Sequence, residues 1–255
     1  MQARSRGRHL ALSLTEWVLA VICAVAVGLS KGGLMMVGTI SVPLLSLVMS
    51  PVQAAALLLP VYIVSDMGGL VAYRKAWDRR VLLSLLPGAV LGIAAGWATA
   101  HLVSDRVVGL IVGVIGAVYA IRALWRPARA GLRRPDAMRG SFWGLLAGYT
   151  SFVSHNGAAP YQVYVQPLGL SAMAYAGTTT VFFAIVNLIK LIPYAALGQF
   201  SAANLAVAAI LCLPALASVW LGVRLVRIMP AAIFYRFITW ALLLVSLRLI
   251  WAGLR

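Results

Sequence analysis

Long apolar runs separated by short polar or basic segments dominate the 255-residue sequence. Hydrophobic residues make up 63% of the chain and charged residues only 10%, a balance that a soluble domain of this size does not need. Several runs approach or exceed the roughly 20 residues with which a helix crosses a bilayer. The sequence therefore predicts an all-α polytopic membrane protein. The apolar runs cover residues 14–49 (broken), 54–73, 81–100, 107–125, 141–166 (broken), 172–197, 205–223 and 232–253.

A segment rich in Arg, Pro and Gly divides the eight runs into two groups of four. We expect a first repeat over residues 1–125, a cytoplasmic linker over residues 126–140 and a second repeat over residues 141–255. The first run of each group is interrupted. The sequence thus predicts about eight transmembrane segments as two repeats of four, with the first segment of each repeat broken or re-entrant.

Clustered basic residues predict how the chain is oriented. Lys and Arg accumulate in cytoplasmic loops, so we assign residues 1–8, 74–80 and 122–139 to the cytoplasm, which includes the N-terminus. Single crossings between these segments satisfy all three assignments. In the second half, a parallel repeat places the arginines of residues 224–227 outside, whereas a hairpin at residues 141–166 reverses this and agrees with the charges. The helix count and the parallel or inverted relation of the repeats stay open.

The net charge of +16, from 21 Lys+Arg against 5 Asp+Glu, bears on the partners of the chain. In a soluble protein it would indicate nucleic acid. Here the basic residues lie in loops and termini, where they meet anionic headgroups, so we expect membrane lipid and no nucleic acid as partner. Cys23 and Cys212 lie in apolar runs and are interpreted as small core residues. They form no metal motif, and we expect no cofactor and no metal site.

The first apolar run is too long for one straight crossing. A helix of about 36 residues is about 54 Å long, whereas the hydrocarbon core is about 30 Å thick. A break at Lys31-Gly32-Gly33 solves the length problem, because glycine permits the backbone geometry that a break requires. The break also places one cation and free backbone N–H groups at membrane depth.

A similar interruption occurs in the second half. Ser30-Lys31-Gly32-Gly33 aligns with Ser154-His155-Asn156-Gly157, and Pro43 and Pro167 follow at equal spacing. The common order of these matches predicts an internal duplication, as in many membrane transporters. After a deletion of about three residues, further pairs are Ser50 with Ser171, Ala55 with Ala176, Asp66 with Asn187, Tyr73 with Tyr194, and Pro87 with Pro214.

Polar groups inside apolar runs are expensive in lipid, so each is a candidate site residue. Lys31 either attracts an anion, helped by backbone N–H groups, or extends its amine to an interface. His155 is either a structural group or a ligand. Asp66 is the only acid well inside an apolar run; it carries a proton, balances Lys31 or caps a break. The other candidates for coupling or a polar path are Gln53, Thr178, Asn187 and Lys190; the threonine alternatively bonds to helix carbonyls, and Lys190 alternatively snorkels.

The equivalent places of the two breaks predict one shared anion site. Lys31 would supply a fixed charge, and His155 would add charge below neutrality. Backbone N–H groups around both breaks would complete a cradle for an oxyanion, since irregular backbone is tolerated where it lines a cavity. The predicted substrate-binding residues are Ser30, Lys31, Gly32, Gly33, Ser154, His155, Asn156 and Gly157.

Particular motifs of the chain are similar to those of a known family. In the first half they are Gly28-Leu-Ser-Lys-Gly-Gly33 with Pro43, Ser50-Pro-Val-Gln-Ala-Ala-Ala56, and Tyr73-Arg-Lys-Ala-Trp-Asp78. In the second half they are Phe152-Val-Ser-His155, Pro160-Tyr-Gln162, Gly177-Thr-Thr179, Phe182-Phe183 and Asn187-Leu-Ile-Lys190. Over about residues 14–253 the sequence resembles the TauE/SafE sulfite exporter family.

The resemblance implies a duplicated four-helix unit in a bacterial inner membrane and transport of sulfite, an organosulfonate or a related small sulfur-containing anion. The glycine motif is shorter here than the Gly-x-Gly-Gly-Gly form of many members. This difference concerns the size and identity of the substrate and not the membership of the family. An inside-negative potential favours export of an anion by about 2.3 kcal/mol per charge per 100 mV. The alternative is a proton-coupled importer, with Asp66 or His155 as the coupling group.

Two other classes of protein are less consistent with the sequence. Ser30 and Lys31 are neighbours and so do not face each other as nucleophile and base, and no Gly-x-Ser-x-Gly elbow occurs, so we expect no enzyme. A non-transporting membrane subunit is the other alternative, against which the paired polar breaks argue. The sequence leaves a homo-oligomer open.

Overall fold

The computed structural model describes residues 12–49, 51–99, 102, 104–125, 133–154, 156–196 and 202–254. The structure is 86% helix, and no strand occurs within these described residues. In chain order the helices are α1 (Leu14–Lys31), α2 (Met35–Gly38), α3 (Ser41–Leu45), α4 (Pro51–Ala72), α5 (Arg79–Thr99), α6 (Asp105–Trp125), α7 (Ala137–Ser154), α8 (Ala158–Val165), the 3-10 helix η1 (Gln166–Leu168), α9 (Ala172–Ala196), α10 (Ala202–Ile228) and α11 (Ala231–Leu254).

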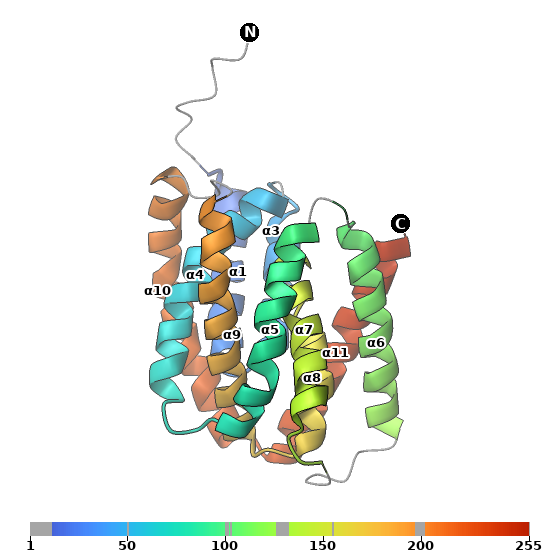
Figure 1. Ribbon diagram of the computed structural model, residues 1–255. Coiled ribbons are helices and arrows are strands. Elements are labelled where there is room, and N and C mark those ends of the chain that lie inside the picture. The colour runs from blue at the N-terminus through green and yellow to red at the C-terminus, as the bar shows by residue number, and fades with distance from the viewer. Residues whose placement is uncertain are drawn as a thin grey trace.

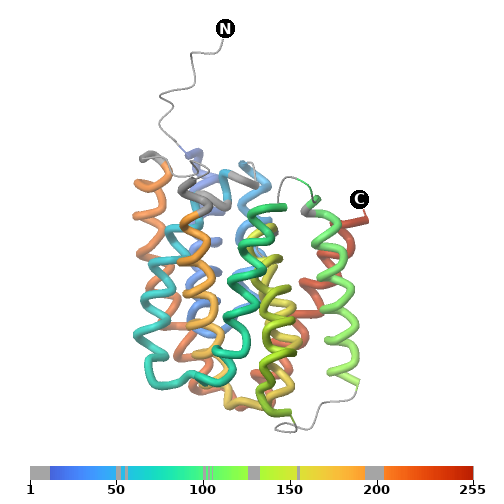
Figure 2. The backbone as a smooth tube through the Cα atoms, in the orientation of Figure 1, coloured from blue at the N-terminus to red at the C-terminus, as the bar shows by residue number. Residues whose placement is uncertain are grey.

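The long helices stand side by side in one bundle (Figures 1 and 2). Six stretches are long and apolar enough to cross a membrane, and they lie in α1, α5, α6, α9, α10 and α11. Shorter apolar stretches occur at Met35–Leu45 and in α4 at Leu57–Ala72. Many large apolar side chains on the outside of the bundle are exposed, as a lipid-facing surface requires. The chain is therefore a multi-pass membrane protein. The number of eight transmembrane segments remains a prediction.

The first apolar run breaks where the sequence predicts. Helix α1 ends at Lys31, and Gly33 adopts φ +111°, a region that residues with a side chain rarely enter. The chain then reverses, so that α2 and α3 run back along α1. Two reciprocal contacts hold this hairpin: the Ser41 hydroxyl donates to the Cys23 carbonyl, and the Cys23 thiol donates to the Ser41 carbonyl, both at 3.2 Å.

This hairpin changes the path predicted for the first half. Helices α1 and α4 run in the same direction, because Ala20 and Cys23 pack with Leu57 and Leu58 while Lys31 lies beside Gly69. The start of α1 and the turn after α4 consequently lie at opposite ends of the bundle (Figure 1). The expected single crossing from residue 14 to residue 49, followed by a return in α4, is wrong, because the break turns the chain back.

The second broken run forms a similar hairpin from the opposite end. Helix α7 ends at Ser154 and α8 begins at Ala158. Helix α8 then returns to the start of α7, where the Tyr164 hydroxyl donates to the Asp136 carbonyl at 3.0 Å. The predicted linker is described only from residue 133, and its last residues already belong to α7.

Small residues bring two pairs of parallel helices into close contact. Helix α5 packs along α7, where a Cβ on Gly88 would lie 1.8 Å from the Ser141 carbonyl oxygen. Helix α1 packs along α10, where a Cβ on Gly28 would lie 2.0 Å from the Ala215 carbonyl oxygen. Without a hydrophobic force between helices in lipid, such close backbone packing is a main source of association. Each hairpin is thereby fixed to a long helix of the other half of the chain.

The helices α4 and α9 run antiparallel through the middle of the bundle. Two contacts show the opposite directions: Gly177 packs on the Ala76 carbonyl, and Asn187, which comes later in the chain, bonds to Asp66, which comes earlier. Helices α6 and α11 form a second antiparallel pair at the side (Figure 1). The polar residues that the sequence singles out inside apolar runs meet around α4 and α9.

Candidate functional site

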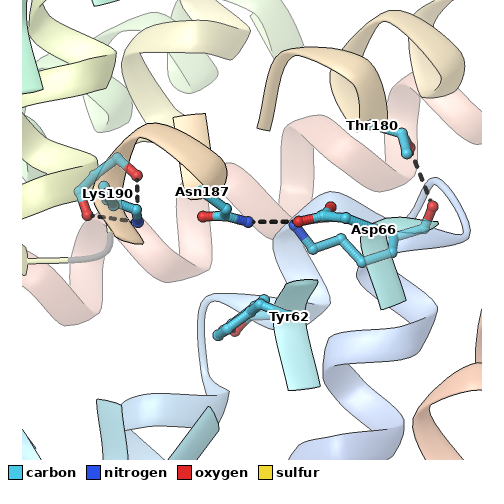
Figure 3. Close-up of polar contacts among 8 residues, drawn as sticks. Tyr62, Asp66, Thr180, Asn187 and Lys190 are labelled. Atoms are coloured by element: carbon cyan, nitrogen blue, oxygen red, sulfur yellow. Dashed lines mark hydrogen bonds and ion pairs between the residues drawn. The ribbon is translucent and has the colours of Figure 1, made fainter. Parts of the chain in front are cut away.

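A buried ion pair joins the first break to α4. Lys31, in the last turn of α1, places its Nζ 2.7 Å from Oδ1 of Asp66 (Figure 3). The two residues are only 5% and 1% exposed. Nζ also lies 5.2 Å from the ring centre of Tyr62, one turn before Asp66 on α4, in a cation–π contact. The C-terminal end of a helix favours a nearby cation, so α1, Tyr62 and Asp66 all interact favourably with the ammonium group.

Asp66 has a second partner from the other half of the chain. Nδ2 of Asn187 donates to Oδ2 of Asp66 at 2.7 Å (Figure 3). The two carboxylate oxygens are thus divided between α1 and α9. This contact joins two residues that the sequence comparison pairs as equivalents.

A second buried lysine lies one turn further along α9. Nζ of Lys190 donates to the carbonyl oxygen of Ser151 at 3.2 Å and to its hydroxyl at 3.1 Å. The residue is 2% exposed, so it does not extend to an interface as the alternative reading of the sequence had it. Within the part of the chain that the structure describes, no carboxylate forms an ion pair with Lys190.

These residues border one cavity of about 60 Å³ between the two halves of the chain. Liquid water takes about 30 Å³ per molecule, so the space suits a group of a few heavy atoms. Most polar residues of the wall come from α1, α7 and α9, and its apolar residues come from α2, α4, α8 and α9. Residues of the wall that bear on its chemistry are Ser30, Lys31, Ser151, Ala158, Asn187 and Lys190.

Two side chains from other parts of the bundle hold the backbone of the first break in place. The Tyr73 hydroxyl donates to the Gly32 carbonyl at 2.6 Å, and the Thr180 hydroxyl donates to the Lys31 carbonyl at 3.1 Å. These two bonds satisfy carbonyls that α1 leaves without a helical partner at its C-terminus. They connect the position of Lys31 to the residue that follows α4 and to α9.

The glycines of the first break have a structural role in this conformation. The N–H of Gly32 donates to the Gly28 carbonyl and the N–H of Gly33 donates to the Ser30 carbonyl. Neither glycine borders the cavity, and both pack against neighbouring helices. The expected oxyanion cradle of N–H groups is therefore not formed here, because these donors already bond within the chain.

The second break is described only in part. His155 lies outside the described residues, and so does the side chain of Ser154. Asn156 is half-buried, and its N–H donates to the Thr150 carbonyl at 3.1 Å. Gly157 is buried against α7, where a Cβ would lie 2.5 Å from the Ala147 carbonyl oxygen. Of the segment that follows, Ala158 reaches the cavity, so residues next to both breaks border the same space.

Two further candidates lie away from the cavity wall. The Thr178 hydroxyl donates to the Ala174 carbonyl at 2.6 Å and accepts from the Asp78 N–H at 2.9 Å, so it connects α9 to the turn before α5. This is the helix-carbonyl role that the sequence left as an alternative. Gln53 is exposed in the first turn of α4.

Sequence reasoning missed two residues of the wall. Tyr62 lies four residues before Asp66 on one helix face, a spacing that could have found it. Ser151 contacts Lys190 through tertiary packing, for which no local signal exists in the sequence. Within the described residues, no group of three or more His, Cys, Asp or Glu side chains could hold a metal ion.

Fold and site together define a multi-pass membrane protein with buried ionisable side chains around a cavity inside the helix bundle. Such residues are rare in membrane spans and mark the pathways of ions and substrates. The model of the sulfite exporter TauE/SafE family matches residues 20–249, nearly the whole chain. The chain belongs to this family, a family of membrane transporters of sulfur anions. A comparison with curated proteins found no match.

Proposed function

We propose that this protein is a secondary transporter that exports sulfite or a small organosulfonate, and that the cavity between its halves is the substrate site. The observation that carries the proposal is the charge of the cavity: Lys31 and Lys190 border it, and Asp66 is the one buried acid among the described residues. An excess of positive charge in a low-dielectric space attracts an anion strongly.

We further propose that the chain consists of two inverted repeats, residues 1–125 and 141–255. Equivalent helices run in opposite directions, since α4 is antiparallel to α9 and α6 is antiparallel to α11. The close pair α1 and α10 has its equivalent in the close pair α7 and α5. Residues on a pseudo-two-fold axis meet their own equivalents, which is what Asp66 and Asn187 do. Transporters of this kind bind substrate near the membrane midplane between the repeats.

The distribution of charge supports an orientation in the bacterial inner membrane. Most Lys and Arg residues lie where α4 turns into α5, α6 ends, and α10 turns into α11. The positive-inside rule makes this end cytoplasmic. Because α1 starts at the other end (Figure 1), this orientation places Leu14 on the periplasmic side and replaces the expected cytoplasmic N-terminus. The basic residues are Arg74, Lys75, Arg79, Arg80, Arg122, Arg133, Arg134, Arg139, Arg224, Arg227 and Arg236.

The direction of export follows from the membrane potential. An inside-negative potential favours outward movement of an anion by about 2.3 kcal/mol per charge per 100 mV, so export needs no other source of energy. Proton-coupled uptake is the second candidate, and the buried carboxylate of Asp66 between Lys31 and Asn187 favours it. A proton on Asp66 would change the charge of the cavity during a transport cycle.

Flux through purified protein in liposomes tests the function. Liposomes loaded with radiolabelled sulfite should lose label faster than protein-free liposomes, and an imposed inside-negative potential should increase the rate. Acceleration of this loss by an outwardly directed proton gradient, without any effect of potential, would favour the proton-coupled importer. Equal rates with and without protein, for both sulfite and methanesulfonate, would contradict transport of this class of anion.

A further inference from the structure

The charges around the cavity do not cancel. Three charged side chains of the described chain are buried, and they are Lys31, Asp66 and Lys190. Asp66 gives one oxygen to Lys31 and the other to Asn187, so the acid is fully occupied. Among the described residues, the acceptors of Lys190 are the carbonyl and hydroxyl of Ser151. With all three groups ionised, the site carries one net positive charge, and that charge resides on Lys190.

An unbalanced buried cation is unfavourable, because low-dielectric surroundings do not solvate it as water does. A bound anion of single charge removes the imbalance, whereas a dianion replaces it with an imbalance of the opposite sign. The formal charge of the pocket thus distinguishes ligands of similar shape and different valence. Lys31 contributes little to this distinction, since Asp66 lies 2.7 Å from it and neutralises it locally.

Donors for an oxyanion converge at Lys190. An ammonium group has three donors, of which two bond to Ser151. The Ser151 hydroxyl accepts from Lys190, and its own proton has no acceptor among the described residues. Nδ2 of Asn187 uses one hydrogen for Asp66 and has a second. All three residues border the cavity, so three hydrogen-bond donors are available for the oxygens of one small anion.

We propose that the site selects monovalent oxyanions, such as a sulfonate or hydrogensulfite, over divalent ones, with Lys190 as the cation that contacts the anion and Lys31 as the counter-ion of Asp66. This inference rests on the transport function proposed above and adds to it the valence of the substrate. It also reassigns the main charge of the site from Lys31, where the sequence alone places it, to Lys190.

Anion binding to purified protein and variants tests the proposal, with methanesulfonate as the monovalent probe and sulfate as the divalent probe. Wild-type protein should bind methanesulfonate more tightly than sulfate by about tenfold or more, as expected for one full charge at short range. Lys190→Met removes the net charge and should lose methanesulfonate binding by at least about tenfold.

A charge-matched double variant separates the two lysines. Lys31→Met alone leaves Asp66 and Lys190 with no net charge, so methanesulfonate binding should fall as in Lys190→Met. Lys31→Met/Asp66→Asn restores one positive charge, and its methanesulfonate affinity should return to within about threefold of wild type. Asp66→Asn alone raises the net charge to two and should reverse the preference, with sulfate raising its thermal stability more than methanesulfonate does.

Two results would overturn the inference. If the double variant loses methanesulfonate binding as completely as Lys190→Met, Lys31 is itself an anion ligand. If wild-type protein binds sulfate at least as tightly as methanesulfonate, the site does not select anions by their charge. In either case, transport of labelled sulfite by wild-type protein in liposomes would still support the proposed transport function. Absence of such transport would contradict both the function and the selectivity for monovalent anions.

Discussion

Gly33 is the residue on which the first break depends most. Its φ of +111° is strained for any residue with a side chain, and three neighbours crowd the place where a Cβ would lie: the Tyr73 hydroxyl at 2.7 Å, Ala176 at 2.8 Å and Val226 at 2.9 Å. The position of Lys31, two residues earlier, follows from this turn. Local backbone geometry therefore determines where the ion pair with Asp66 forms.

Substitution of this glycine tests that dependence. Gly33→Ala should destabilise the protein by about 2 kcal/mol or more, since both the backbone and the packing become unfavourable. Thermal unfolding of the detergent-solubilised variant measures the effect. Gly109→Ala is the matched control, because its Cβ would meet only Leu249 at 3.7 Å, an ordinary contact. Equal melting temperatures for the two variants would show that the turn at Gly33 is not strained.

At the level of residues, the sequence predicted the individual polar groups better than their partners. Lys31, Asp66, Asn187 and Lys190 stand out in it because charge and amide groups are costly in lipid. Which lysine pairs with Asp66 depends on how α1, α4 and α9 pack, and composition carries no information about that. The N–H groups of Gly32 and Gly33 bond within their own turn, which composition does not reveal either, and the part of the cradle around Gly157 remains a prediction.

At the level of helices, the two breaks determine where α1 and α7 end. Breaks at Lys31 and Ser154 end α1 and α7 where the sequence places them, because glycine and polar residues interrupt an otherwise continuous apolar run. Whether the chain then turns back or continues cannot be read from hydrophobicity, since both paths remain in an apolar environment. The turn back is fixed by tertiary contacts such as those between Cys23 and Ser41.

The contact between α5 and α7 allows a graded test of element packing. A Cβ at Gly88 would lie 1.8 Å from the backbone oxygen of Ser141, whereas at Gly96 it would lie 3.2 Å from the side chain of Phe152. Backbone cannot move aside without separating the helices, while a side chain can adjust. Gly88→Ala should therefore lower stability by about 1–3 kcal/mol, and Gly96→Ala should lower it much less. Thermal unfolding of the two variants measures the difference. A larger loss of stability in Gly96→Ala than in Gly88→Ala would contradict the observed packing.

At the scale of the whole molecule, two hairpins enter the bundle from opposite ends and meet at one cavity. Each is anchored to the other half, α1 on α10 and α7 on α5. Alternating access by rocking of repeats around a fixed site is the ordinary mode of such transporters, and this architecture has the parts that it needs.

The orientation of the bundle makes the last prediction. In a background in which Cys23 and Cys212 are replaced by alanine, single cysteines would be introduced at Lys75 and Arg134 at the basic end and at Leu14 and Leu102 at the opposite end; all four positions are exposed. If the basic end is cytoplasmic, an impermeant maleimide added to intact cells should label Leu14→Cys and Leu102→Cys and leave Lys75→Cys and Arg134→Cys unlabelled until the cells are opened. The reverse pattern would invert the molecule in the membrane. Labelling of Leu14→Cys and Lys75→Cys from the same side would contradict the opposite placement of the start of α1 and the turn after α4, and with it the inverted repeat.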